Sequence, residues 1–125
     1  MYERVGGDAF FETLTRRFYA GVATDADLTP LYPGDPEEFE AARRHLCAFL
    51  IQYWGGPATY SEQRGHPRLR MRHGPFAIGP TERDAWLRHM TAAVREAALK
   101  GLDEAQMLTY FESAAHHMVN VETAG

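Results

Sequence analysis

The chain has 125 residues, of which 45% are hydrophobic and 24% charged, the balance of one folded globular domain rather than of a disordered or fibrous chain. Its formal net charge of −4 argues against a general nucleic-acid binder, which usually carries a basic domain. The single cysteine, Cys47, excludes an intramolecular disulfide and a cysteine-rich zinc site. No stretch approaches the apolar length that spans a membrane, and the first residues lack the pattern of a secretory signal. We therefore expect a single domain over residues 1–125, located in the cytoplasm.

Helical periodicity predicts an all-α fold, and the first half of the chain is expected to hold two long helices. One is expected over residues 8–23, with Asp8 as its N-cap, after a short segment that ends at Gly6 and Gly7. A break follows, with a short helical turn near residues 31–32. The next helix is expected over residues 36–54, because a Gly-Gly-Pro sequence comes directly after it.

Two further helices are expected in the second half. Thr81, with Asp84 three residues later, predicts an N-cap and capping box, and Gly101 predicts the end of that helix. The last helix is expected to open at Asp103. Its inward stripe is expected to consist of Met107, Phe111, Ala114 or Ala115, and Met118.

The segment between the second and third helices is rich in helix breakers and in positive charge. Residues 55–80 contain four prolines, five glycines, and four arginines against one acidic residue. The arginines could be solvated and paired with carboxylates on neighbouring helices. They could also bind an anion, since guanidinium groups bind carboxylate and phosphate in a bidentate manner. One hypothesis is therefore a haem-free helical module that binds an anionic ligand or partner through residues 64–73.

His73 ends this basic run and supports a different hypothesis. The six histidines include no pair at the spacing of a helical two-histidine metal site, and most of them are expected to be ordinary surface or core residues. A single imidazole is nevertheless all that a haem iron needs from the protein, because the porphyrin supplies four nitrogens. The carboxylate groups of haem would also account for the arginines beside His73.

Three strings of the sequence resemble the group II truncated haemoglobins. They are YWGGP at residues 53–57, YSEQRGHPRLRMRH at residues 60–73, and ERDAWL at residues 82–87. The resemblance extends over nearly the whole chain, from about residue 5 to residue 119. It implies a two-over-two sandwich of α-helices around one haem b, and reversible binding of dioxygen and other diatomic ligands.

The resemblance also implies a set of site residues. His73 corresponds to the proximal iron ligand, and Tyr19, Tyr32 and Trp86 correspond to polar groups of the distal ligand pocket. The other candidates of the distal pocket are Ala42, Leu46 and Phe18. The remaining candidates for contact with the haem are Phe49, Leu50, Met71, Phe76 and Ile78 around the ring, and Tyr60, His66, Arg70 and Arg72 at the propionates.

These residues predict slow release of dioxygen. A hydrogen bond to a charged group is worth about 1.5–3 kcal/mol, so each donor is expected to slow release by roughly ten- to a hundredfold. The same polar groups would suit a nitric oxide dioxygenase or a peroxidase-like activity. The chain contains no reductase domain, so either activity would need electrons from an external reductase. The oligomeric state is left open, with a homodimer among the alternatives.

Overall fold

The computed structural model describes residues 1–56 and 78–119, and the secondary structure of these residues is entirely helical, without a strand. The elements are α1 (Tyr2–Val5), α2 (Gly7–Val22), the short 3₁₀ helix η1 (Thr29–Leu31), α3 (Pro36–Tyr53), α6 (Pro80–Glu96) and α7 (Asp103–Met118). In this part of the chain, no helix combines the length and the hydropathy needed to cross a bilayer.

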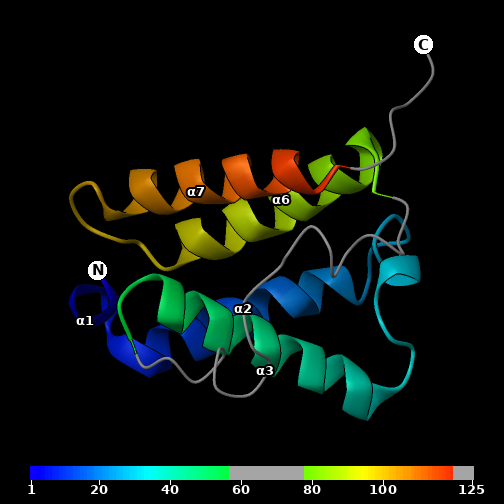
Figure 1. The fold of residues 1–125 in the computed structure, drawn as a ribbon, viewed down its shortest axis with the longest axis horizontal. Coiled ribbons are helices and arrows are strands. Elements are labelled where there is room, and N and C mark those ends of the chain that lie inside the picture. The colour runs from blue at the N-terminus through cyan, green and yellow to red at the C-terminus, as the bar shows by residue number, and fades with distance from the viewer. Residues whose placement is uncertain (57–77, 120–125) are drawn as a thin grey trace.

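The long helices form two pairs that lie one over the other (Figure 1). Helix α2 packs against α3 in one layer, α6 packs against α7 in the other, and α2 also contacts α6 across the two layers. This arrangement confirms the predicted two-over-two, all-α fold. The short helix α1 confirms the expected segment before Gly6 and Gly7.

The start of α2 differs from the prediction. Its N-cap is Gly6, with a φ of 119°, and no side chain caps the helix. Asp8 lies inside the first turn, where its carboxylate accepts a hydrogen bond from the Tyr2 hydroxyl. The prediction of Asp8 as N-cap is wrong because α1 turns into α2 through Gly6, and a φ in this left-handed region strongly favours glycine.

Helix α3 begins as the sequence predicts, whereas α6 does not. The Asp35 carboxylate caps α3 by accepting a hydrogen bond of 3.0 Å from the backbone N–H of Glu38. Helix α6 is capped by Gly79 and takes Pro80 as its first residue, so Thr81 is not the N-cap. Proline suits this position because its fixed φ is already helical and its missing N–H is not needed there.

The end of α6 also comes earlier than predicted. The helix ends at Glu96, and Ala98 adopts a φ of 50°, so the chain has already left the helix before Gly101. Asp103 opens α7 as predicted. Its carboxylate accepts hydrogen bonds from the Arg4 guanidinium at 2.6, 3.0 and 3.1 Å, which joins α1 to the start of α7.

The hydrophobic core lies between the two layers. Its largest fully buried side chains are Phe11, Leu14, Phe18 and Val22 of α2, Leu28 of the loop before η1, Leu50 of α3, Met90 and Val94 of α6, and Met107 and Phe111 of α7. Burial of one such side chain is worth about 1.5–3 kcal/mol, and this burial is the main force that holds the layers together.

One charged side chain is buried between α2 and α3. Arg43 of α3 is only 4% exposed, and its guanidinium donates to Glu40 at 2.5 Å, to Glu12 of α2 at 2.8 Å, and to the Thr15 hydroxyl at 3.2 Å. These partners compensate the cost of burying the charge. They also raise the pKa of Arg43, with the hydrogen bond to Glu40 as the main cause.

Candidate functional site

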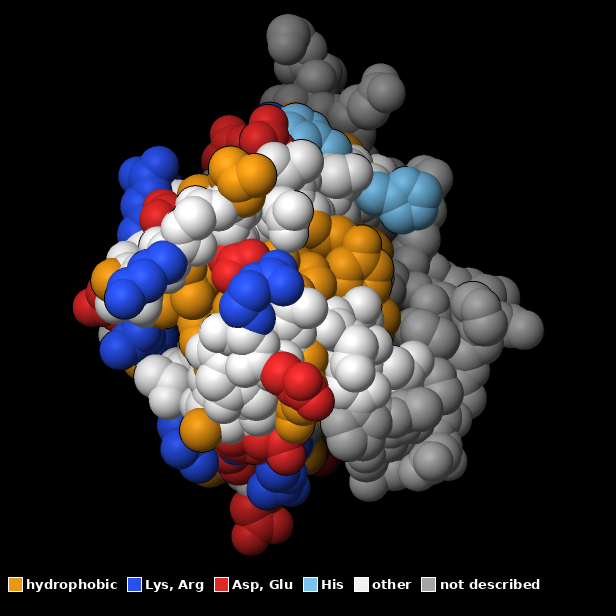
Figure 2. All heavy atoms as spheres, turned by 90° about the vertical axis from the view of Figure 1, so that its left-hand side faces the viewer, with side chains coloured by type: hydrophobic (Ala, Val, Ile, Leu, Met, Phe, Trp, Pro, Cys, Tyr) orange, Lys and Arg blue, Asp and Glu red, His pale blue; other side chains and the backbone are white. Residues whose placement is uncertain are grey.

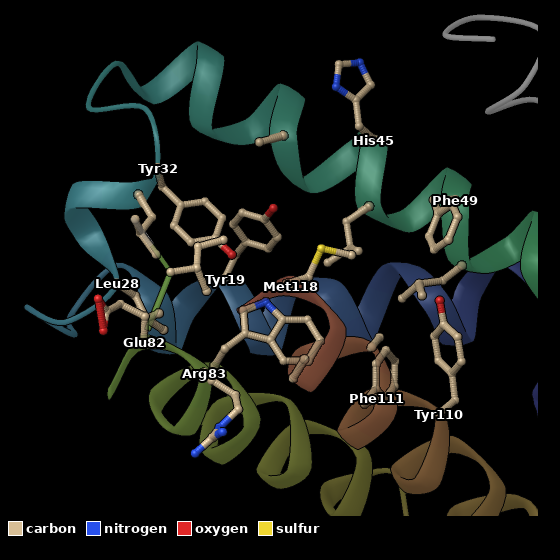
Figure 3. A pocket seen from close by; sticks show the side chains of 18 of the residues that line it. Tyr19, Leu28, Tyr32, His45, Phe49, Glu82, Arg83, Tyr110, Phe111 and Met118 are labelled. Atoms are coloured by element: carbon tan, nitrogen blue, oxygen red, sulfur yellow. The ribbon is translucent and has the colours of Figure 1, made fainter. Parts of the chain in front are cut away.

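A cavity of about 350 Å³ lies between the two helix pairs. This volume is within the range of roughly 300–1,000 Å³ that is typical of ligand and cofactor sites. Most of the lining is aliphatic or aromatic, and Figure 3 shows it from close by. The lining residues are Tyr19 on α2; Leu28, Leu31, Tyr32 and Pro33 around η1; Ala42, His45, Leu46, Phe49 and Leu50 on α3; Ile78 before α6; Glu82, Arg83 and Trp86 on α6; and Tyr110, Phe111, Ala114, Ala115 and Met118 on α7.

The structure brings most of the described candidates together around this cavity. The candidates in its lining are Tyr19, Tyr32, Ala42, Leu46, Phe49, Leu50, Ile78 and Trp86. Phe18 is fully buried but does not line the cavity. Its ring packs edge-on against Tyr19 at a centroid distance of 5.3 Å and against Trp86 at 5.2 Å, so it supports both side chains from behind.

Several candidates lie outside the described residues. They are His73, Tyr60, His66, Arg70, Met71, Arg72 and Phe76. The basic loop at residues 64–73 falls in the same part of the chain. The roles of these residues stay predictions from the resemblance.

Polar groups gather at one end of the pocket. The rings of Tyr19 and Tyr32 meet edge-on at a centroid distance of 5.4 Å (Figure 3). Burial raises the pKa of Tyr32, and a hydrogen bond with Trp86 opposes part of this rise. An indole N–H can only donate, so Trp86 is the donor in this contact.

The Tyr19 hydroxyl differs from the Tyr32 hydroxyl in its hydrogen bonding. The residue is 6% exposed, and burial is the main cause that raises its pKa. Within residues 1–56 and 78–119 no group forms a hydrogen bond with this hydroxyl. A buried polar group without a partner costs about 1–3 kcal/mol. A protonated, buried hydroxyl in the wall of a cavity is therefore a donor available to a polar ligand.

Asp25 holds the loop that carries Tyr32 against α6. Its backbone carbonyl accepts hydrogen bonds from Leu28 at 3.0 Å and Thr29 at 2.9 Å. Its carboxylate accepts from Arg88 at 2.8 Å and from His89 Nε2 at 2.7 Å, both on α6. These bonds, with that from His89 as the main cause, lower the pKa of Asp25. The contact fixes the Tyr32 loop relative to the helix that bears Trp86.

The charged residues of the lining lie at its rim. Figure 3 shows the Arg83 side chain directed away from the other lining side chains, and its guanidinium contacts Asp84 at 3.0 Å and His116 at 3.4 Å. The imidazole of His45 is likewise directed away from the middle of the pocket. The interior of the pocket thus remains apolar apart from its aromatic donors.

The wall that α7 contributes to the pocket was not predicted from the sequence. The helical stripe through Phe111, Ala114 or Ala115, and Met118 was expected to face inward, as it does. Periodicity alone cannot tell a core face from a pocket wall, because both are apolar and inward. Other residues that were not identified as pocket residues, namely Leu28, Leu31, Pro33, Glu82, Arg83 and Tyr110, carried no local signal for the site.

Two helix pairs, one over the other, that enclose an apolar pocket with tyrosine and tryptophan donors define a protein of the globin class. The family model described as "Bacterial-like globin" matches residues 1–120. The chain therefore belongs to the bacterial-like globin family, as a group II truncated haemoglobin. Haem b is the cofactor of this family, and a diatomic gas such as dioxygen is its ligand.

Individual relatives agree with this assignment. Group 2 truncated hemoglobin YjbI of Bacillus subtilis (strain 168) is 40% identical over 119 residues, which cover 95% of this chain and 87% of that protein. A thermostable hemoglobin from Thermobifida fusca is 57% identical, with a TM-score of 0.91 and 96% of each chain covered. The truncated oxygen-avid haemoglobin from Bacillus subtilis is 39% identical, with a TM-score of 0.87 and with 95% of this chain and 98% of that chain covered.

The residues of the pocket fit a haem with a small polar ligand. The cavity has the volume of a cofactor site, and Phe49, Leu50 and Ile78 give it apolar walls that suit a porphyrin ring. The hydroxyl of Tyr19, which has no hydrogen-bond partner among residues 1–56 and 78–119, supplies a donor in a mostly apolar wall. The family assignment also decides against the haem-free module as the explanation of the basic loop.

Proposed function

We propose that this chain binds dioxygen reversibly on haem b and releases it slowly. The haem would lie in the cavity between the helix pairs, with His73 as its iron ligand and with Phe49, Leu50, Met71, Phe76 and Ile78 against the ring. Tyr60, His66, Arg70 and Arg72 would contact its propionates. Ferrous haem held by one histidine supplies an iron with an open position for a diatomic ligand. The truncated haemoglobin of Bacillus subtilis that is called oxygen-avid supports this proposal.

The observation that carries the proposal is the buried hydroxyl of Tyr19. Its raised pKa keeps this hydroxyl protonated, and thus a donor, throughout the physiological pH range. Dioxygen on ferrous iron acquires negative charge, and a hydrogen bond to a charged group is worth about 1.5–3 kcal/mol. Loss of such a bond therefore speeds release by roughly ten- to a hundredfold.

The other pocket residues complete the environment. Trp86 and Tyr32 would add donors at the same end of the pocket, and donors that share one ligand are not expected to act additively. The side chain of Ala42 is small, so it leaves space for the ligand beside α3. Leu46 and the supporting ring of Phe18 would exclude water and thereby slow oxidation of the iron.

The test is the rate of dioxygen dissociation from the haem-loaded chain. The Tyr19→Phe and Trp86→Phe variants keep the ring packing and remove one donor each. Tyr2→Phe is the matched control, because Tyr2 bonds Asp8 and does not line the cavity. Faster release in the pocket variants with an unchanged control would support the proposal. Unchanged rates in both pocket variants would overturn the proposed roles.

The proposal extends to redox chemistry on the same ligand. Donors that hold bound dioxygen can also hold nitric oxide or peroxide, so either could be consumed if a separate reductase restored ferrous iron. Nitrate formed from nitric oxide and the dioxygen-loaded protein, over repeated turnovers with a reductase, would support this extension. A single turnover without recovery would restrict the protein to binding.

Two structural expectations belong to the same proposal. We propose that residues 1–125 form one domain, and the match of the family model over residues 1–120 supports this. The oligomeric state is left open, with a homodimer among the alternatives, and sedimentation of the haem-loaded chain at several concentrations is the test of a homodimer. A concentration-independent monomer would contradict it.

A further inference from the structure

Asp25 holds the loop that carries Tyr32 in two ways, from within the loop and from α6. One carboxylate oxygen accepts a hydrogen bond of 2.9 Å from the backbone N–H of Asp27, inside the loop. The other oxygen accepts from Arg88 at 2.8 Å and from His89 at 2.7 Å, both on α6. In Figure 1 the loop lies at the end of the molecule where α2 ends and α6 begins. A single side chain therefore fixes both the shape of the loop and its place against α6.

A short series of backbone hydrogen bonds connects Asp25 with Tyr32. The Asp25 carbonyl accepts from the N–H of Thr29 at 2.9 Å, and the Thr29 carbonyl accepts from the N–H of Tyr32 at 3.2 Å. The Asp25 carbonyl also accepts from the N–H of Leu28 at 3.0 Å, and Leu28 lines the pocket. Figure 3 shows Leu28 and Tyr32 at the same end of the pocket. A displacement of Asp25 therefore reaches Tyr32 through two hydrogen bonds.

His89 places this loop relative to two other helical positions of the pocket. Its ring lies directly on the backbone of α2, because a Cβ on Gly21 would come within 3.0 Å of its Cε1 and Cγ. Gly21 is two residues after Tyr19 on α2, and His89 is three residues after Trp86 on α6. The hydrogen bond between His89 and Asp25 therefore holds the Tyr32 loop against both helices that bear the other aromatic donors.

We propose that Asp25 and His89 are positioning residues that determine how strongly the pocket favours dioxygen over carbon monoxide. The inference rests on the proposed function, since it requires a haem whose ligand meets Tyr19, Tyr32 and Trp86. Bound dioxygen carries negative charge and gains from a nearby donor, whereas bound carbon monoxide carries little charge and gains much less. A hydrogen bond weakens steeply when its geometry departs from the optimum. The placement of the Tyr32 loop therefore affects the retention of dioxygen much more than that of carbon monoxide.

His89 contributes more to this placement than Arg88 does. The Arg88 side chain is 62% exposed, and an exposed ion pair is worth little. The side chains of His89 and Asp25 are only 22% and 12% exposed, so their hydrogen bond competes less with water. The contact needs no positive charge on His89, because a neutral imidazole also has an N–H that donates. Another side chain with a donor at this position should therefore keep the loop in place.

The experiment compares two variants of His89 in the full haem-loaded chain. His89→Leu keeps much of the bulk of the ring and removes its donor, whereas His89→Gln keeps a side-chain N–H that can reach Asp25. We expect His89→Leu and Asp25→Ala to release dioxygen roughly three- to tenfold faster, less than loss of a whole donor would cause. Their release of carbon monoxide should change by less than about twofold. His89→Gln should restore most of the retention of dioxygen.

Amide hydrogen exchange tests the placement of the loop independently of ligand release. The N–H groups of Leu28, Thr29 and Tyr32 take part in the hydrogen bonds that begin at Asp25. His89→Leu should make these amides exchange faster with solvent, although the substitution lies on another helix. The carbon–oxygen stretching frequency of bound carbon monoxide reports donors beside the ligand, and it should shift in the same variant.

Arg95→Ala is the matched control, because it removes another contact of α6 far from the Tyr32 loop. The Arg95 side chain contacts Glu104 of α7 at 3.8 Å, where α6 ends and α7 begins. Figure 2 looks onto this end of the molecule, where charged side chains of both signs reach the surface. Arg95→Ala should change neither the release of dioxygen nor the exchange of the loop amides.

The outcomes separate this inference from the proposed function. Equal acceleration of dioxygen and carbon monoxide release in His89→Leu would overturn the inference, because it would indicate a general opening of the pocket. Unchanged dioxygen release in His89→Leu or Asp25→Ala, or an equal loss of retention in His89→Gln, would also overturn it. If one of these variants does not fold, the others decide. Failure of the chain to bind haem or dioxygen, or unchanged release in both Tyr19→Phe and Trp86→Phe, would instead refute the proposed function.

Discussion

Replacement of Gly21 by alanine should destabilise this protein, although the same change in most helices is stabilising. Gly21 lies in the last turn of α2, and its φ is not in the left-handed region, so alanine is compatible with its backbone. Alanine in a helix interior is favoured over glycine by roughly 0.5–1 kcal/mol. At this position, however, a Cβ would come within 3.0 Å of Cε1 and Cγ of His89 and closer still to Nδ1.

The imidazole of His89 cannot move away without loss. Its Nε2 forms the 2.7 Å contact with Asp25 that holds the Tyr32 loop to α6. An extra carbon forced into a packed contact costs about 1–3 kcal/mol. The steric cost of the contact with His89 therefore exceeds the gain in helix propensity, and the free energy of unfolding should fall by about 1 kcal/mol.

A double-mutant cycle tests this reasoning. Urea denaturation of the haem-loaded protein gives the free energy of unfolding for Gly21→Ala, His89→Ala and the double variant. Without the His89 ring the clash is absent, so Gly21→Ala in the His89→Ala background should stabilise the protein by about 0.5–1 kcal/mol. Gly34→Ala is a control, because nothing lies within 4 Å of a Cβ there. Equal destabilisation in both backgrounds would refute the steric explanation.

Three further predictions follow from the ion pairs. The pKa of Asp25 is lowered in the folded state. Its contribution to stability is therefore present above the ordinary pKa of a carboxyl group and is lost as the pH falls through the lowered value. Asp25→Asn should flatten the acid limb of a plot of the free energy of unfolding against pH. Arg4→Ala should destabilise the protein at neutral pH and have little effect in strong acid, because the pKa of Asp103 is lowered mainly by its hydrogen bond with Arg4. An equal loss of stability at both pH values in urea denaturation would contradict this. Arg43→Ala should lower the free energy of unfolding by about 1–3 kcal/mol, whereas Arg16→Ala, which removes an exposed contact of 3.6 Å to the same Glu12, should change it little.

Local signals in the sequence explain which helix ends could be predicted. Asp35 followed by Pro36 is a strong local start signal, and the glycines after Trp54 are a strong stop signal, so the bounds of α3 were predicted within a residue. The start of α6 was predicted wrongly because Thr81 is a residue type typical of N-caps, whereas the N-cap is Gly79 and the first helical residue is Pro80. A cap depends on the backbone conformation that the tertiary structure selects, and composition does not reveal that conformation.

In the pocket as well, contacts between residues far apart in the sequence could not be predicted from local signals. The resemblance identified Tyr19, Tyr32 and Trp86, because their positions match a family pattern. The contact of Asp25 with His89 joins residues 64 positions apart and has no local signature. Gly21 likewise looks like an unexplained helix interruption until the ring that packs on it is known. Tertiary contacts of this kind position the polar groups of the pocket, and only the structure reveals them.

Tyr19 and Trp86 should not contribute equally to the retention of dioxygen. The indole N–H of Trp86 interacts with the Tyr32 hydroxyl and opposes the rise of its pKa, so a bond from Trp86 to a ligand would weaken an existing interaction. The Tyr19 hydroxyl has no partner among the described residues, so a bond from it to a ligand is a net gain of about 1.5–3 kcal/mol. Tyr19→Phe should therefore accelerate dioxygen dissociation by roughly ten- to a hundredfold and Trp86→Phe by less. Stopped-flow measurement of both rates decides the order, and a larger effect of Trp86→Phe would show that the engagement with Tyr32 does not limit what the indole donates to the ligand.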